Sequence, residues 1–210
     1  EDGSMLVLKS SYKQIPIWTR IDADGTQKKL RVKDISADNY YSSKNGNVVY
    51  TAFEPHPRWG WKEYSVVKIW NTETDEVKNI SSKSRLFMPD ISADGEQVVA
   101  VQVGTDQQWF LQMIDVKNQT GTNLPNPNQY SYTYPKFSAN NAAVISAERN
   151  ATGEMALLQT DLSTKEETIL LPFTNTPIGY LQVAGDTILF TAAQKEGDVL
   201  FLYDLKNKSL

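Results

Sequence analysis

The architecture of this chain can be read from residues 92–115, SADGEQVVAVQVGTDQQWFLQMID. Asp94-Gly95 is typical of a tight turn, because Asp and Gly tolerate the positive φ that such turns need. The residues that follow alternate along a β-branched run, as in a strand, and a further strand ends on Ile114-Asp115. The stretch therefore predicts two antiparallel strands introduced by a hairpin turn.

Both anchors of this stretch recur in phase. Residues 138–141, SANN, match the turn, and Thr160-Asp161 matches the strand end, with the same 23-residue interval from Ser to Asp as in the first copy. Ser36-Ala37-Asp38 is interpreted as a third copy of the turn. Two independent anchors at one spacing indicate a structural repeat.

The strand end itself appears five times, with intervals of 49, 44, 46 and 43 residues between the polar positions. These positions are Asp22, Asn71, Asp115, Asp161 and Asp204. The interval fits a propeller blade and exceeds that of most helical repeats. We therefore predict an all-β fold, a β-propeller of four-stranded antiparallel blades; a β-sandwich also has many short strands but does not predict equal spacing.

The expected blades form one domain over residues 1–210. They cover residues 5–33, 34–83, 86–125, 132–172 and 178–210. The first blade begins at its second strand and the last ends after its third. Because propellers close by pairing strands from the two chain ends, we expect about five blades that belong to a larger propeller, with a small closed five-bladed ring as the alternative.

The composition excludes several classes of function. The chain has 25 acidic and 21 basic side chains, a net charge of -4, so it lacks the basic stripe of a nucleic-acid-binding protein. It contains no cysteine, which excludes disulfides and thiol chemistry. No apolar stretch reaches the length of a membrane span. We expect no cofactor and no bound metal.

The phased turn and strand end resemble the TolB-like, WD40-like repeats (PD40 type) of bacterial β-propellers. The fuller turn of that repeat is Ser-Pro-Asp-Gly; here Ala37, Ala93 and Ala139 stand at the proline position, and only Asp94-Gly95 keeps the last two residues. The resemblance implies a periplasmic or outer-membrane-associated protein. It implies no catalytic residues, because the repeat itself carries none.

The strongest candidate for a binding site is residues 53–64, FEPHPRWGWKEY, which interrupt the hairpin between the second and third strands of the second unit. Exposed aromatic residues with arginine anchor protein interfaces, and flat aromatic faces also hold sugars. The candidate partner-binding residues are His56, Arg58, Trp59, Trp61 and Tyr64. The alternative is that both tryptophans fold back over the hairpin or the neighbouring blade.

His56 is the only histidine and lies between two prolines. A general base needs a placed nucleophile or water, and the sequence has no Gly-x-Ser-x-Gly elbow to provide one. We therefore expect no catalytic residues in this chain.

Two functions remain open. The first is a non-catalytic module that binds a protein, a peptide or a glycan in the bacterial cell envelope, beside the remaining blades or domains of its parent chain. The second is a propeller that gates substrate entry to a larger hydrolase, such as a prolyl-oligopeptidase-like peptidase, whose catalytic domain lies outside this chain.

Overall fold

The computed structural model describes residues 3–36 and 38–210. Its regular elements are 18 strands, joined by turns and loops, and no helix occurs among the described residues. These residues accordingly offer no helical segment of the length and apolarity that would cross a membrane. The strands form five antiparallel sheets, which confirms the predicted all-β propeller fold, and we number them as blades 1 to 5 in chain order.

The chain divides into two compact units, Glu1–Ile35 and Ser36–Leu210. The first unit is blade 1, a sheet of three strands. It contains β1 (Met5–Ser11), β2 (Gln14–Ile21) and β3 (Gln27–Val32). As predicted, the strand that begins at Met5 is followed by two further strands, and the turn between β2 and β3 begins at Asp22. That the two units form a single domain stays a prediction.

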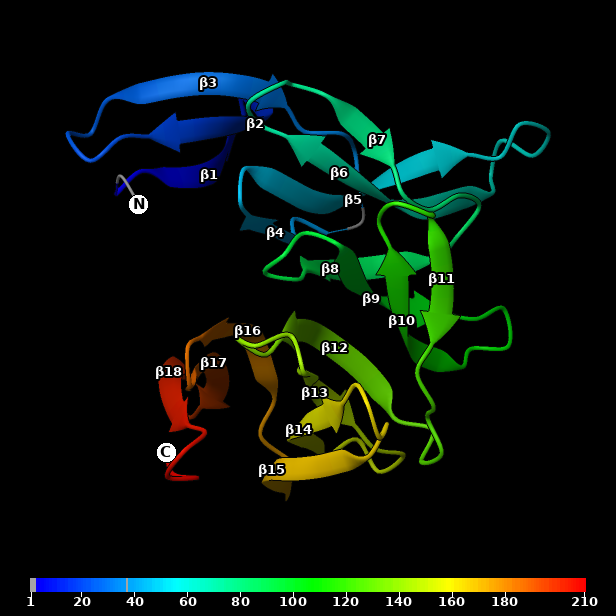
Figure 1. Ribbon diagram of the computed structural model, residues 1–210, viewed down its shortest axis with the longest axis vertical. Coiled ribbons are helices and arrows are strands. Elements are labelled where there is room, and N and C mark those ends of the chain that lie inside the picture. The colour runs from blue at the N-terminus through cyan, green and yellow to red at the C-terminus, as the bar shows by residue number, and fades with distance from the viewer. Residues whose placement is uncertain (1–2, 37) are drawn as a thin grey trace. The chain divides into compact units, whose positions relative to one another are not determined.

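The second unit holds the other four blades, which follow one another in chain order from teal to red in Figure 1. Blade 2 contains β4 (Tyr41–Lys44), β5 (Asn47–Pro55), β6 (Glu63–Asn71) and β7 (Val77–Asn79). Blade 3 contains β8 (Leu86–Ile91), β9 (Gln97–Val103), β10 (Trp109–Asp115) and β11 (Thr120–Asn123). Blade 4 contains β12 (Ser131–Phe137), β13 (Ala143–Arg149), β14 (Met155–Asp161) and β15 (Glu167–Thr174). Blade 5 contains β16 (Ile178–Ala184), β17 (Thr187–Gln194) and β18 (Gly197–Asp204).

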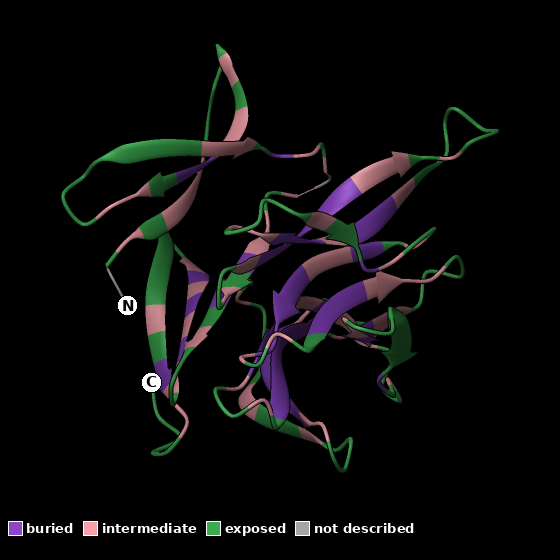
Figure 2. Cartoon of the chain, turned by 45° about the horizontal axis from the view of Figure 1, so that its top comes forward, coloured by how far each residue is buried: buried purple, intermediate pink, exposed green. Residues whose placement is uncertain are grey.

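Strands β9, β13 and β14 of blades 3 and 4 are buried on both faces, because each of these two sheets packs between two others. In β9, Val98 and Ala100 pack toward blade 2, whereas Val99 and Val101 pack toward blade 4. A strand buried on both sides reads as a continuous apolar run rather than an alternating one. Figure 2 shows the resulting buried segments in the interior strands of the second unit.

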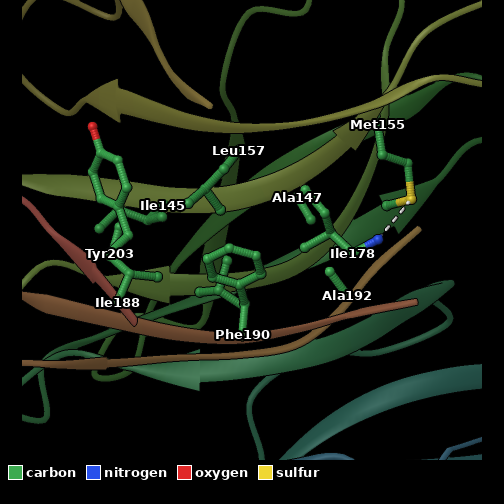
Figure 3. Close-up of a cluster of buried hydrophobic side chains, with 10 residues drawn as sticks. Ile145, Ala147, Met155, Leu157, Ile178, Ile188, Phe190, Ala192 and Tyr203 are labelled. Carbon is green, nitrogen blue, oxygen red and sulfur yellow. Dashed lines mark hydrogen bonds between the residues drawn. The ribbon is translucent and has the colours of Figure 1, made fainter. Parts of the chain in front are cut away.

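The interface between blades 4 and 5 shows what stabilises this packing (Figure 3). Leu157 of blade 4 lies in one buried cluster with Ile188 and Phe190 of blade 5. Burying one such side chain contributes about 1.5–3 kcal/mol. Blades 2 to 5 therefore present apolar faces to one another at their interfaces.

Four of the five repeated polar residues, Asn71, Asp115, Asp161 and Asp204, accept backbone N–H groups in the turn after the third strand of their blade. Asp161 Oδ1 accepts hydrogen bonds from the backbone N–H groups of Ser163 and Thr164, at 2.8 and 2.9 Å. These bonds and the one from the Ser163 hydroxyl lower the pKa of Asp161 to about 2. Asn71 and Asp204 bind the same backbone positions. The recurrence is thus structural.

One predicted equivalence was wrong. Ser36 and Asp38 lie before β4, and Ala37 falls outside the described residues. The turn that matches residues 92–95 is Asn45-Gly46, whose φ angles are 49° and 74°, as an Asn-Gly hairpin turn requires. Asp38 instead caps the approach to β4, where its Oδ1 accepts the Tyr40 N–H at 3.0 Å.

Candidate functional site

The first strands of the blades in the second unit surround a cavity of about 650 Å³. Its walls come from β4, β8, β12 and β16 and from the segment that precedes β4. The lining side chains with aromatic, charged or amide groups include Asp38, Tyr40, Asp90, Tyr134, Lys136, Tyr180 and Gln182. Four successive blades therefore contribute to one concave site, the form in which ligand sites usually occur.

Three residues that line the cavity share the same unusual backbone conformation. Met88, Tyr134 and Tyr180 have φ angles of 51°, 55° and 48°, and each lies in an irregularity of its strand's pairing. They are spaced by 46 residues, and the Tyr134 N–H lies 3.5 Å from Met88 Sδ. Positive φ is uncommon outside glycine, and bulges re-aim side chains. The first strands of blades 3, 4 and 5 are thus bent at one equivalent position.

The tyrosines of the cavity form a row. The ring centroids of Tyr40 and Tyr134 are 5.0 Å apart, and those of Tyr134 and Tyr180 are 6.0 Å apart. Lys136 Nζ lies 5.4 Å from the Tyr40 ring at the other end. Burial raises the pKa of Tyr40 and Tyr134, so their hydroxyls stay neutral. The Tyr180 side of the row is open, since that residue is 65% exposed.

Gly179 makes room for this row. A Cβ atom at this position would lie 3.2 Å from Thr191 Oγ1 and 3.8 Å from the Tyr134 hydroxyl oxygen. The absent side chain therefore allows Tyr134 and β17 to approach β16 closely.

A buried ion pair forms the inner wall. Lys136 Nζ lies 3.2 Å from Asp90 Oδ1, and the Phe137 N–H donates to Asp90 Oδ2 at 2.8 Å. The two side chains are only 3% and 4% exposed. Because both carboxylate oxygens are engaged, this pair joins β8 to β12 rather than presenting a reactive group.

The predicted hairpin insertion is present between β5 and β6, and we call residues 56–62 the tryptophan hairpin tip. Trp61 is fully exposed and Trp59 is 57% exposed, so neither indole is buried. Arg58 lies 5.0 Å from the Trp59 ring, and the His56 and Tyr64 rings are 5.7 Å apart. The five candidate residues thus lie on one hairpin, and their binding role stays a prediction.

The backbone of the tip is organised by His56. Its Nδ1 atom accepts the N–H groups of Arg58 and Trp59, at 3.1 and 3.2 Å. Lys62 Nζ lies 5.7 Å from the Tyr64 ring. The tip therefore presents two cations and two indole rings on a folded turn.

Sequence reasoning missed the cavity, because its residues belong to no shared motif. The detectable signal was the 46-residue spacing of Met88, Tyr134 and Tyr180. It also missed Glu148, which is fully buried with Oε1 accepting the Ser146 hydroxyl at 2.8 Å. Burial and the nearby Glu167 raise the pKa of Glu148 to about 8.

No model of a protein family matches the sequence, and neither does any curated protein. Solved structures match its fold. TolB from Acinetobacter baumannii is 12% identical with a TM-score of 0.75, over 98% of this chain and 50% of that one. A protein identified as TolB from Agrobacterium tumefaciens is 12% identical with a TM-score of 0.73, over 95% and 73%.

Peptidases also contain a similar propeller. Prolyl endopeptidase is 10% identical with a TM-score of 0.64, over 97% of this chain and 33% of that one. This chain thus spans half of the Acinetobacter protein and a third of the peptidase. At these identities the likeness concerns the fold alone.

Proposed function

We propose that this chain, a β-propeller with the fold of TolB, is a non-catalytic module that binds a protein or a peptide. The observation that carries the proposal is the convergence of Met88, Tyr134 and Tyr180 on one cavity. Each of the three has a strained φ, which costs about 1–3 kcal/mol and persists where the surrounding structure enforces it. Strain repeated at equivalent positions around a cavity supports a shared ligand.

The chemistry of the cavity supports binding rather than catalysis. Its deepest charges, Lys136 and Asp90, are already paired with each other, and the neighbouring tyrosine hydroxyls are neutral. The open face of Tyr180 suits an aromatic ring, a guanidinium or the apolar face of a sugar. A glycan is therefore the other ligand class, whereas a polypeptide also offers the backbone donors and acceptors that Asp38 and Gln182 suit.

The tryptophan hairpin tip is the second surface that we assign to partner binding. Its Trp59, Trp61 and Arg58 are of the types most enriched among interface residues that dominate affinity. Their exposure and their position on one turn support this role. We place the module in the periplasm or at the outer membrane, because the repeat resembles those of bacterial envelope proteins.

A selection with a random-peptide phage library on the immobilised chain tests the proposal. Selected peptides should bind Tyr134→Ala and Tyr180→Ala chains at least about tenfold more weakly, since each loses a large buried contact. Tyr12→Ala, at an exposed turn of blade 1, is the matched control and should bind as the parent does. Peptides that bind all three variants equally would contradict a cavity site.

The alternative is a propeller that filters substrates for a peptidase. The likeness to prolyl endopeptidase supports it. A Gly-x-Ser-x-Gly elbow in the parent reading frame would favour this role, and its absence would favour the binding module. Peptide hydrolysis by this chain alone would contradict both.

A further inference from the structure

The tip of the tryptophan hairpin is held by few backbone hydrogen bonds. The His56 N–H donates to the Lys62 carbonyl at 2.8 Å, and the Lys62 N–H donates to the Trp59 carbonyl at 2.9 Å. Pro57 has no N–H to donate. The N–H groups of Arg58 and Trp59 have the imidazole Nδ1 of His56 as their partner. One side-chain atom thus orders the turn that carries both exposed indoles.

This atom accepts hydrogen bonds only while it lacks a proton. In neutral imidazole one nitrogen is an acceptor, whereas in the imidazolium both nitrogens are donors. A proton on Nδ1 would therefore set three donors against one another and end both bonds. His56 is the only histidine in the chain. A response of the tip to protonation of an imidazole can therefore be assigned to it.

The charged and titratable groups around His56 come from three segments. Tyr64 of β6 faces the imidazole, with ring centroids 5.7 Å apart. Glu54 of β5 lies opposite Tyr64 in the register and accepts the Asn79 amide of β7 at 2.6 Å. Arg58 and Lys62 lie on the tip itself, and Glu63 begins β6. The groups that respond directly to a proton on His56 Nδ1 are the backbone N–H groups of Arg58 and Trp59, which are hydrogen-bonded to it.

We propose that His56 is a proton-sensitive latch, which orders the tip of the tryptophan hairpin when neutral and releases it when protonated. Release would separate Arg58 from the Trp59 ring, 5.0 Å away in the closed turn. The use of this latch in partner binding rests on the proposed function of the hairpin. The latch itself is a property of the turn.

Residue-resolved NMR of the chain, titrated from pH 8 to pH 5, tests the latch. The amide signals of Arg58 and Trp59 should shift upfield together, with one midpoint. Their protection from hydrogen exchange should fall about tenfold, the effect expected when one hydrogen bond is lost. Amides of Val66 and Val67 in β6 should stay unchanged, which shows that the blade remains folded. Arg58 and Trp59 amides that do not respond between these pH values would overturn the proposal.

Two substitutions separate the latch from other pH effects. His56→Asn keeps a side-chain acceptor near the same backbone groups but does not titrate, so the tip should stay ordered at both pH values. His56→Ala removes the acceptor, so the two amides should be unprotected throughout. A pH response that survives in His56→Asn, or ordered amides in His56→Ala, would show that another group holds the turn.

These readouts need no partner. If the latch responds as expected while Trp59 and Trp61 prove dispensable for capture of library peptides, the binding role of the hairpin fails and the latch stands. If the His56 variants show no latch while Trp59 and Trp61 are needed for capture, the latch fails and the binding role of the hairpin stands.

Discussion

Lys136 Nζ lies 3.2 Å from Asp90 Oδ1, and the two side chains are buried between the first strands of blades 3 and 4. A buried charge without its partner is costly, whereas a buried pair costs little relative to a neutral replacement of both. The pair therefore fixes how β8 and β12 sit against each other beneath the tyrosine row.

Removal of the Lys136 charge alone should destabilise the fold severely. Lys136→Met should lower the free energy of unfolding by about 3–5 kcal/mol, because Asp90 is left buried and charged. Asp90→Asn combined with Lys136→Met should cost less than the single change, since no charge remains. Urea denaturation measures both. The matched control is Lys206→Met at the exposed pair with Asp186, which should leave the midpoint unchanged; equal losses in Lys136→Met and this control would refute the argument.

A methyl group at Gly179 should disturb the cavity. The Cβ of Gly179→Ala would lie 3.2 Å from Thr191 Oγ1, and overpacking of this kind costs about 1–3 kcal/mol. We also expect weaker binding of selected peptides, because the Tyr134 ring is the next neighbour. Thr191→Ala in the same chain removes the nearest atom and should recover most of the stability. Unfolding curves of the single variant that overlay the parent would rule out this close approach.

The pH dependence of stability should report Glu148. Its pKa is raised in the folded chain to about 8 from an ordinary value of 4.5. Between these two pH values the folded state holds a proton that the unfolded state has lost. The stabilisation of the folded state by this proton is therefore complete below about pH 4.5 and declines as pH rises toward 8. The limiting slope is about 1.4 kcal/mol per pH unit for one proton.

Glu148→Gln should flatten that slope, because the amide does not titrate. The exposed Glu196→Gln is the control and should keep it. Urea denaturation at pH 5, 6.5 and 8 gives the comparison. Parallel pH profiles for the parent and Glu148→Gln would mean that Glu148 ionises normally in the fold.

Removal of the fully exposed indole of Trp61 should not affect the fold. Trp61→Ala should unfold at the parent urea concentration, because the side chain covers no neighbour. Trp70→Ala, which removes a buried indole from blade 2, should lower stability by about 3–5 kcal/mol. A loss at Trp61 of similar size would show that its ring packs against the protein after all.

The sequence was sufficient for the blades because their signals are local. A turn such as Asp94-Gly95 and a cap such as Asp161 act within a few residues, so they recur wherever a blade recurs. The turn at Ser36 was assigned wrongly because a Ser-x-Asp cap also occurs directly before a strand. There Asp38 accepts a hydrogen bond from the Tyr40 N–H. The Asn45-Gly46 turn carried the stronger hairpin signal.

The sequence analysis missed the cavity for a physical reason. Its wall joins residues from four blades. Three of these residues, Met88, Tyr134 and Tyr180, point inward only because their strands bulge at positive φ. No local preference of Met88 or Tyr134 predicts that conformation. The hairpin tip, by contrast, was found from composition alone, since two tryptophans and the only histidine interrupt a short turn.

A ligand site in the cavity is tested most directly by mapping a library-selected peptide onto the chain by NMR shift perturbation. We expect the signals of Tyr40, Met88, Tyr134 and Tyr180 to change together at low peptide concentration, while those of the outer strands β7, β11 and β15 do not. Perturbations confined to the outer strands, with the tyrosine row unaffected, would contradict a binding site in the cavity.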